Sequence, residues 1–142
     1  MKNLRIYSSS NIIRKKKLHQ YVKFVTQDLN LSLRSLEINF IDSETIKEIN
    51  KNFLSHDYST DIITFNYSDS QNIIDGEIFI SVDDAKENAK KFKVKFQEEI
   101  GRLVAHGILH LIGFDDTTTD QRKKMKNQEN QLLKKNKFIL LR

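Results

Sequence analysis

The spacing of apolar residues changes repeatedly along this chain between the period of a strand and that of a helix, and this alternation constrains its fold most. Leu36, Ile38 and Phe40 alternate with polar residues, which is typical of a strand with one buried face. In the segment 82–92 the apolar residues recur at helical spacing instead. We therefore expect strands near 4–7, 36–40, 62–67 and 77–80, and helices near 12–29, 43–53, 82–92, 100–112 and 119–133.

The order of these elements predicts an α+β fold. Only a polar turn, Ser68 to Asp75, separates the third and fourth expected strands, and we expect these two strands to pair as a hairpin. A chain of 142 residues without repeats or a linker fits one domain, residues 1–142. We expect a small mixed sheet of about four strands with helices packed on one side of it.

Composition limits the classes of site and partner. The chain has no cysteine, so any metal must be held by imidazole and carboxylate groups. No apolar run approaches the roughly 20 residues of a membrane span, and the first residues lead into a strand rather than a signal peptide, which predicts a cytoplasmic protein without a membrane partner. The net charge of +5 favours anionic partners, although the abundance of Lys, Asn and Ile is also typical of an AT-rich genome.

Two histidines lie four residues apart on the helix expected near 100–112. Side chains at this spacing share one helix face and lie about 6 Å apart along the axis, so the imidazoles of His106 and His110 are placed to reach one ion. Gly113 follows the last periodic residue and is expected to end the helix and turn the chain back. That turn would bring Asp115 and Asp116 towards the histidines, where a carboxylate can complete the ligand set.

A structural role for the histidine pair remains the alternative, because such pairs are common without a metal. The glycine stop and the adjacent acids favour the metal site. Three of the four glycines lie in this region although glycine costs about 1 kcal/mol in a helix, and at Gly107 we expect the close approach of a strand or a ligand. His19 and His56 have no comparable surroundings, and we do not expect them to bind a metal.

The stretch HGILHLIGFDD, from His106 to Asp116, resembles the motif H-G-x-L-H-L-x-G-[FY]-D-H of the YbeY family, the bacterial rRNA maturation factors and endoribonucleases. Ten of the eleven positions agree. Similar segments include Asp57–Phe65, which resembles D-x-P-T-D-V-L-S-F, and Asp75–Ser81, which resembles G-[DE]-I-x-I-S; Met125 and Glu129 match the family's C-terminal helix.

The resemblance implies a zinc site with one Zn²⁺ per chain, for which His106 and His110 carry over directly. The family's third ligand is a histidine, and on chemical grounds we assign that place to Asp116, whose carboxylate binds zinc at a similar bond length. The extra negative charge should make the ion a weaker Lewis acid. Asp115 matches the motif's own aspartate, and we expect it to support the ligands rather than to bind the ion.

Two further positions depart from the family pattern. Leu54 stands where the family usually has an arginine thought to contact RNA or phosphate, and nearby Lys51 offers charge without arginine's bidentate geometry. Ser59 replaces a proline, which should loosen the entry to the strand near Ile62.

The resemblance implies a metal-dependent hydrolase that cuts single-stranded RNA, acting in 16S rRNA maturation and ribosome quality control, with the ribosome or its assembly factors as partners. No general base is evident, and we assign no catalytic side chain beyond the metal ligands. A non-catalytic ribosome-assembly factor with a structural metal is the second reading. A metallopeptidase is the third, disfavoured because Gly107 stands where H-E-x-x-H enzymes have their glutamate.

Two runs of positive charge, Arg14–Lys17 and Arg122–Lys124, are possible phosphate contacts. Charge runs are more often solvated faces, and the sequence does not decide between the two readings.

Overall fold

The computed structural model describes residues 2–55, 60–137 and 140–141. Within these ranges it contains four strands and five helices, in the order expected from the sequence. Their bounds are β1 Leu4–Ser8, α1 Lys15–Asp28, β2 Ser32–Ile41, α2 Ser43–Leu54, β3 Ile62–Asn66, β4 Ile73–Ser81, α3 Val82–Phe92, α4 Phe96–Leu111 and α5 Thr119–Lys135. None of the described helices is both long and apolar enough to cross a membrane.

The sheet is mixed, as the sequence predicts. Its strand order is β1-β2-β4-β3. β1 pairs parallel with β2 and β2 parallel with β4. β3 and β4 pair antiparallel, from Ile62 opposite Ile80 to Asn66 opposite Gly76. This pairing confirms the hairpin and the α+β class.

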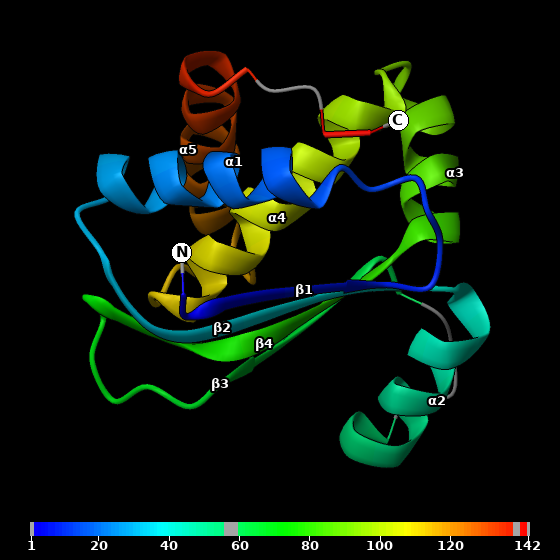
Figure 1. Ribbon diagram of the computed structural model, residues 1–142, viewed down its shortest axis with the longest axis horizontal. Coiled ribbons are helices and arrows are strands. Elements are labelled where there is room, and N and C mark those ends of the chain that lie inside the picture. The colour runs from blue at the N-terminus through cyan, green and yellow to red at the C-terminus, as the bar shows by residue number, and fades with distance from the viewer. Residues whose placement is uncertain (1, 56–59, 138–139, 142) are drawn as a thin grey trace.

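Figure 1 shows α1, α3, α4 and α5 stacked over one face of the sheet. The strands supply this layer with a buried face: Leu36, Ile38 and Phe40 of β2 are fully buried, as their alternation with polar residues predicts. α2 differs from the expectation of helices on one side, because it lies apart from this layer, below the sheet in the view of Figure 1. Its amphipathic pattern predicted a helix but could not specify which face of the sheet it would cover.

α4 is the central helix and packs tightly against the sheet at Gly107. A Cβ atom at this position would lie 2.8 Å from Cδ1 of Ile78 on β4 and 3.1 Å from Cδ1 of Ile62 on β3. The contact with Ile78 would require that side chain to shift, and the contact with Ile62 would be tighter than most, so the glycine permits the close approach. The expected approach of a strand at Gly107 is therefore confirmed, and it fixes the height of His106 and His110 above the sheet.

The turn after α4 follows from Gly113, which adopts a φ of 101°. The backbone N–H of Gly113 donates to the carbonyl of His110 (3.1 Å), and that of Phe114 donates to the carbonyl of Leu109 (3.0 Å). This pair of hydrogen bonds is a Schellman motif, in which glycine takes the left-handed position. The expected helix stop is confirmed, and it directs Asp116 back along the helix.

α5 begins at a capping box. The hydroxyl of Thr118 accepts a hydrogen bond from the backbone N–H of Gln121 (3.1 Å), and the Gln121 side chain accepts one from the backbone N–H of Thr118 (3.1 Å). The helix therefore begins at Thr119, as the expected range of 119–133 predicts. Gln121 lies three residues after Thr118, and this spacing allows the two side chains to satisfy both backbone groups.

Replacing Thr118 with alanine is expected to lower the free energy of unfolding by about 1 kcal/mol, because one N-terminal N–H of α5 loses its acceptor. Thr118→Ser, which retains a capping hydroxyl, should stay within about 0.5 kcal/mol of the native protein. Urea titrations followed by circular dichroism measure both changes. Equal stability of the alanine and serine variants would contradict a capping role for the hydroxyl.

The C-terminal tail returns to the start of α1. The Arg14 N–H donates to the carbonyl of Leu140 (2.7 Å), Leu140 is buried, and Leu141 forms an isolated bridge with Ile13. Phe138 and Ile139, which precede these two residues, lie outside the described part of the chain.

Candidate metal centre

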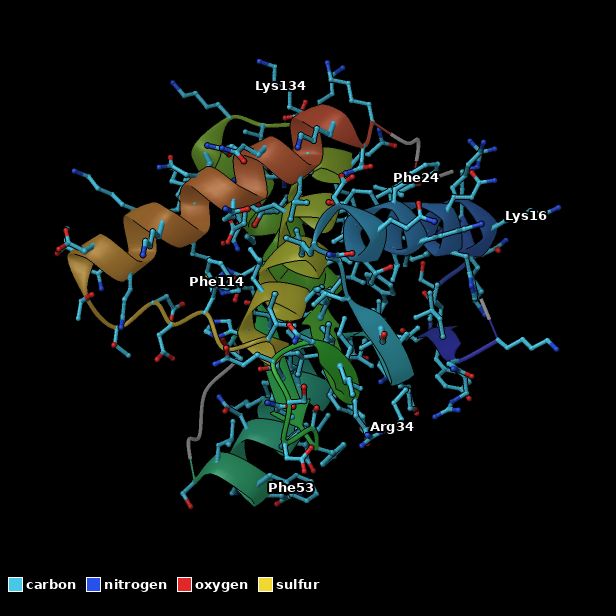
Figure 2. All side chains as sticks on the ribbon, turned by 90° about the vertical axis from the view of Figure 1, so that its left-hand side faces the viewer. Lys16, Phe24, Arg34, Phe53, Phe114 and Lys134 are labelled. Atoms are coloured by element: carbon cyan, nitrogen blue, oxygen red, sulfur yellow. The ribbon has the colours of Figure 1, made fainter. Side chains whose placement is uncertain are left out.

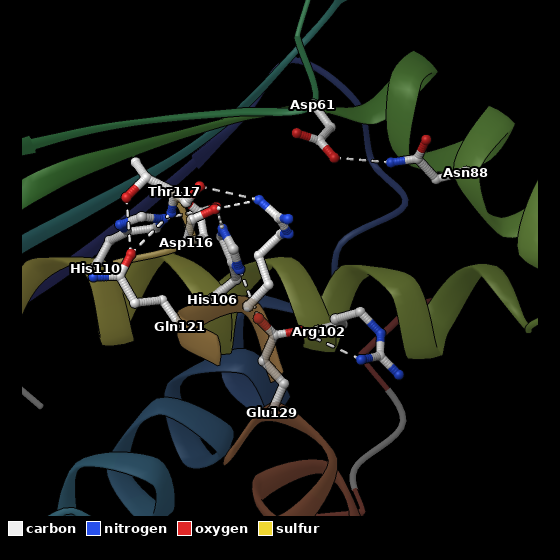
Figure 3. A network of polar contacts seen from close by, with 10 residues as sticks. Asp61, Asn88, Arg102, His106, His110, Asp116, Thr117, Gln121 and Glu129 are labelled. Carbon is white, nitrogen blue, oxygen red and sulfur yellow. Dashed lines mark hydrogen bonds and ion pairs between the residues drawn. The ribbon is translucent and has the colours of Figure 1, made fainter. Parts of the chain in front are cut away.

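The structure brings His106, His110 and Asp116 together. One ligand atom from each residue lies within 4.8 Å of the other two, and this is a geometry that can hold a metal ion. Figure 3 shows the two imidazoles rising from α4, with the Asp116 carboxylate reaching them from the segment after the turn. The imidazole rings stand edge to face, with centroids 4.6 Å apart.

The distances from the Asp116 carboxylate to the two imidazoles fit tetrahedral coordination. Oδ2 of Asp116 lies 3.5 Å from Nε2 of His106 and 3.4 Å from Nε2 of His110. Zinc bonds of ~2.0–2.2 Å at tetrahedral angles place neighbouring ligand atoms about 3.3–3.6 Å apart. The side chains of His106, His110 and Asp116 are 20%, 24% and 40% exposed, so the group is accessible to solvent. Two imidazoles and one carboxylate fit the donor set of a three-ligand, catalytic type of zinc site.

Glu129 of α5 supports the first histidine. Nδ1 of His106 lies 2.6 Å from Oε2 of Glu129, whose side chain is only 7% exposed. With the proton on Nδ1 donated to this carboxylate, the lone pair on Nε2 faces Asp116 and His110. The pair therefore fixes both the tautomer and the orientation of the ring that a metal ligand needs.

In the sequence, Glu129 only matches the family's C-terminal helix, and the residue that we expect to support the metal ligands is Asp115. Asp115 is instead exposed and borders a different cavity, beside Gly113 and Phe114. A signal for Glu129 was present in the sequence: it shares the helix face of Met125 and Leu132, which are buried, so it is an acid at a core position. Buried acids of this kind require a partner.

The charge on Glu129 also affects the protonation of His106. Burial alone lowers the pKa of His106, but the hydrogen bond and charge of Glu129, with the charges of Asp116 and Asp61, outweigh it and raise the pKa above its usual value. Metal binding at Nε2 therefore competes with protonation of the ring up to a higher pH than it would at an ordinary histidine.

A chain of alternating charges continues from Glu129 along α4. Nη1 of Arg102 lies 3.3 Å from Oε1 of Glu129, and Nε of Arg102 lies 3.9 Å from Oε1 of Glu99. Burial raises the pKa of Glu99, which is 3% exposed. The amide of Asn88 on α3 donates to Glu99 (3.4 Å) and to Asp61 (2.9 Å). These contacts connect α5, α4 and α3 with the start of β3, and they hold Glu129 in place.

Arg122 holds the segment that carries Asp116. Arg122 lies in the first turn of α5, and its Nη1 donates to the carbonyls of Asp116 (3.4 Å) and Thr117 (3.2 Å). These bonds restrain the backbone that follows the candidate ligand.

The other positions considered in the sequence lie elsewhere or outside the described residues. Leu54 is 43% exposed at the end of α2 and borders a separate cavity with Asn50 and Ile63. His19 lies on α1 and is not part of the ligand group found among the described residues. His56 and Ser59 fall outside the described residues.

The family model and the curated relatives that match this chain carry the same name. The family model described as endoribonuclease YbeY matches residues 5–137. A protein of Chlorobium limicola named endoribonuclease YbeY is 43% identical over 112 residues, which are 79% of this chain and 77% of that protein. A protein of the same name from Parabacteroides distasonis is 39% identical over 121 residues, 85% of this chain and 84% of its own length. A solution structure from Thermotoga maritima superposes with a TM-score of 0.67 at 25% identity, covering 93% of this chain and 90% of that one.

Proposed function

Since this chain belongs to the endoribonuclease YbeY family, we propose that it is a metal-dependent endoribonuclease that cuts single-stranded RNA. We further propose that it acts in the cytoplasm as a single domain, in 16S rRNA maturation and ribosome quality control, with the ribosome or its assembly factors as partners. The observation that carries the proposal is the convergence of His106, His110 and Asp116, in which the carboxylate lies at tetrahedral spacing from both imidazoles.

These three residues are the proposed ligands of one Zn²⁺ per chain. When bound, a divalent ion supplies charge that stabilises a phosphodiester oxygen and acidifies a water molecule. Zinc fits the mixed nitrogen and oxygen ligand set, although nickel binds imidazole comparably well.

The chain's own side chains have separate roles in this proposal. Glu129 orients His106, Arg102 balances the buried charge of Glu129, and Arg122 fixes the backbone at Asp116. Glu129 is engaged by both His106 and Arg102, so it is a positioning residue rather than the general base.

Of the two runs of positive charge, Arg14–Lys17 lies at the start of α1 and contributes no residue to the candidate metal centre. Lys15 and Lys16 are exposed, and Figure 2 shows Lys16 pointing into solvent. A cavity of about 490 Å³ opens beside His106 and Asp116, and neither lysine borders it. We therefore assign these lysines no part in the cleavage step.

Cleavage of RNA should depend on the metal. Purified protein is expected to cut an unstructured fluorescent RNA, and dialysis against a strong chelator should lower the rate more than about 100-fold, because a metal at the reacting phosphate supplies several kcal/mol. Adding zinc in stoichiometric amount should restore the rate. Gel electrophoresis of the products measures all three rates.

The same preparation separates the alternative functions. Cleavage that survives complete metal removal contradicts the proposal. Binding to ribosomal particles without any RNA cleavage favours the assembly factor with a structural metal, and chelator-sensitive cleavage of casein favours the metallopeptidase.

A further inference from the structure

A cavity of about 490 Å³ opens beside the candidate metal centre, and nothing in the proposed chemistry yet accounts for it. His106 and Asp116 form one side of it, and its volume lies within the ~300–1,000 Å³ of small-ligand sites. Besides Glu99 and Arg102 of α4, its walls come from two elements that do not contribute metal ligands: the end of α3 with the residues after it, and α5.

The α3 wall is apolar. It is formed by Phe92 and Val94, and Phe92 is 59% exposed. Lys93 adopts a φ of 56° and ends α3, so Phe92 is the last residue of the helix and borders the cavity. An exposed aromatic ring beside a polar site offers a surface on which a nucleic-acid base can stack.

The α5 wall is cationic. Arg122 and Lys126 lie one helical turn apart, and both are exposed and border the cavity. Arg122 uses part of its guanidinium to bind the carbonyls of Asp116 and Thr117. Because both side chains stand beside the candidate metal ligands, a phosphate between them and the ion would meet positive charge on two sides.

The carboxylates of the cavity do not cancel this charge. Glu99 and Glu129 are 3% and 6% exposed, and both are paired with Arg102. Asp116 is the exposed acid, and it faces the two histidines as a candidate ligand of the cation. The accessible charge of the cavity is therefore positive on its α5 side.

We propose that this cavity seats one nucleotide of the single-stranded RNA, with its base against Phe92 and its phosphate near Arg122 and Lys126. The inference rests on the proposed ribonuclease function and deepens it by naming the substrate contacts.

Binding of a nuclease-resistant probe tests the seat independently of cleavage. The probe is a fluorescein-labelled, unstructured 2′-O-methyl oligoribonucleotide of nine residues, and fluorescence anisotropy of the zinc-loaded protein gives its Kd. Phe92→Ala is expected to raise the Kd about 5- to 100-fold through loss of stacking. Lys126→Gln should raise it about 3- to 10-fold and reduce the slope of log affinity against log salt by about 0.7.

Lys123→Gln is the matched control, since Lys123 is an exposed lysine of the same helix that does not border the cavity. It should leave both the Kd and the salt slope within twofold of the native values, and all variants should retain their zinc. If Phe92→Ala and Lys126→Gln bind the probe as the control does, the inference is overturned.

The outcome is separable from that of the proposed function. A protein that binds the probe through Phe92 and Lys126 but does not cut RNA supports the seat and contradicts the ribonuclease. A protein that cuts RNA while these two variants bind normally retains the proposed function and loses the seat.

Discussion

Replacing Asp116 with alanine is expected to remove the metal from the protein and to lower RNA cleavage more than about 100-fold. The carboxylate is the one oxygen ligand in the candidate set, and without it the two imidazoles of α4 are left to hold the ion alone. Groups that only support a ligand are already worth about 10- to 100-fold in metal affinity, so loss of a ligand should exceed this.

Two variants make the test specific. Asp115→Ala removes the same charge from the neighbouring exposed residue and should retain metal and activity within about twofold. Asp116→His supplies the histidine that the family motif has at this position. This variant should bind zinc at least as well as the native protein, since imidazole nitrogen and carboxylate oxygen bind zinc at similar bond lengths. Loss of activity in Asp115→Ala but not in Asp116→Ala would show that the other aspartate is the ligand.

Replacing Glu129 with glutamine is expected to weaken zinc binding by about 10- to 100-fold. The amide still reaches Nδ1 of His106, but it lacks the charge that makes the imidazole a better donor to the metal, and it leaves Arg102 without its close partner. Zinc affinity measured by competition with a chromophoric chelator gives the change directly. RNA cleavage at saturating zinc should fall much less than it does in Asp116→Ala.

Glu98→Gln is the control for this change, because Glu98 is an exposed acid in the first turn of α4. It should leave the zinc affinity within about twofold of the native value. Native zinc affinity in a folded Glu129→Gln protein would mean that the contact between Glu129 and His106 does not support the metal centre.

The geometry of the candidate metal centre could be predicted because most of it is local in the sequence. His106 and His110 lie on one helix, and Gly113 ends that helix at a defined residue. These two local features bring Asp116 to the histidines, and Arg122, only six residues further on, holds the segment in place. The strands and helices were predictable for a similar reason, since each follows from its own apolar period.

The surroundings of the centre were less predictable because they depend on contacts between distant segments. Glu129 is 23 residues from His106. Asn88 joins Glu99 to Asp61, and Asp61 lies 27 residues before Asn88. Periodicity shows that such residues face the core but not which partner they meet there. The same limit explains why the position of α2 differed from expectation.

The most direct test of the central claim is the metal content of the native protein, purified untagged and without chelator and measured by elemental mass spectrometry. The account predicts about one zinc per chain, or its uptake to about one per chain when zinc is added to the metal-free protein. A folded native protein that carries no divalent metal and takes up none would contradict the assignment of His106, His110 and Asp116 as a metal centre.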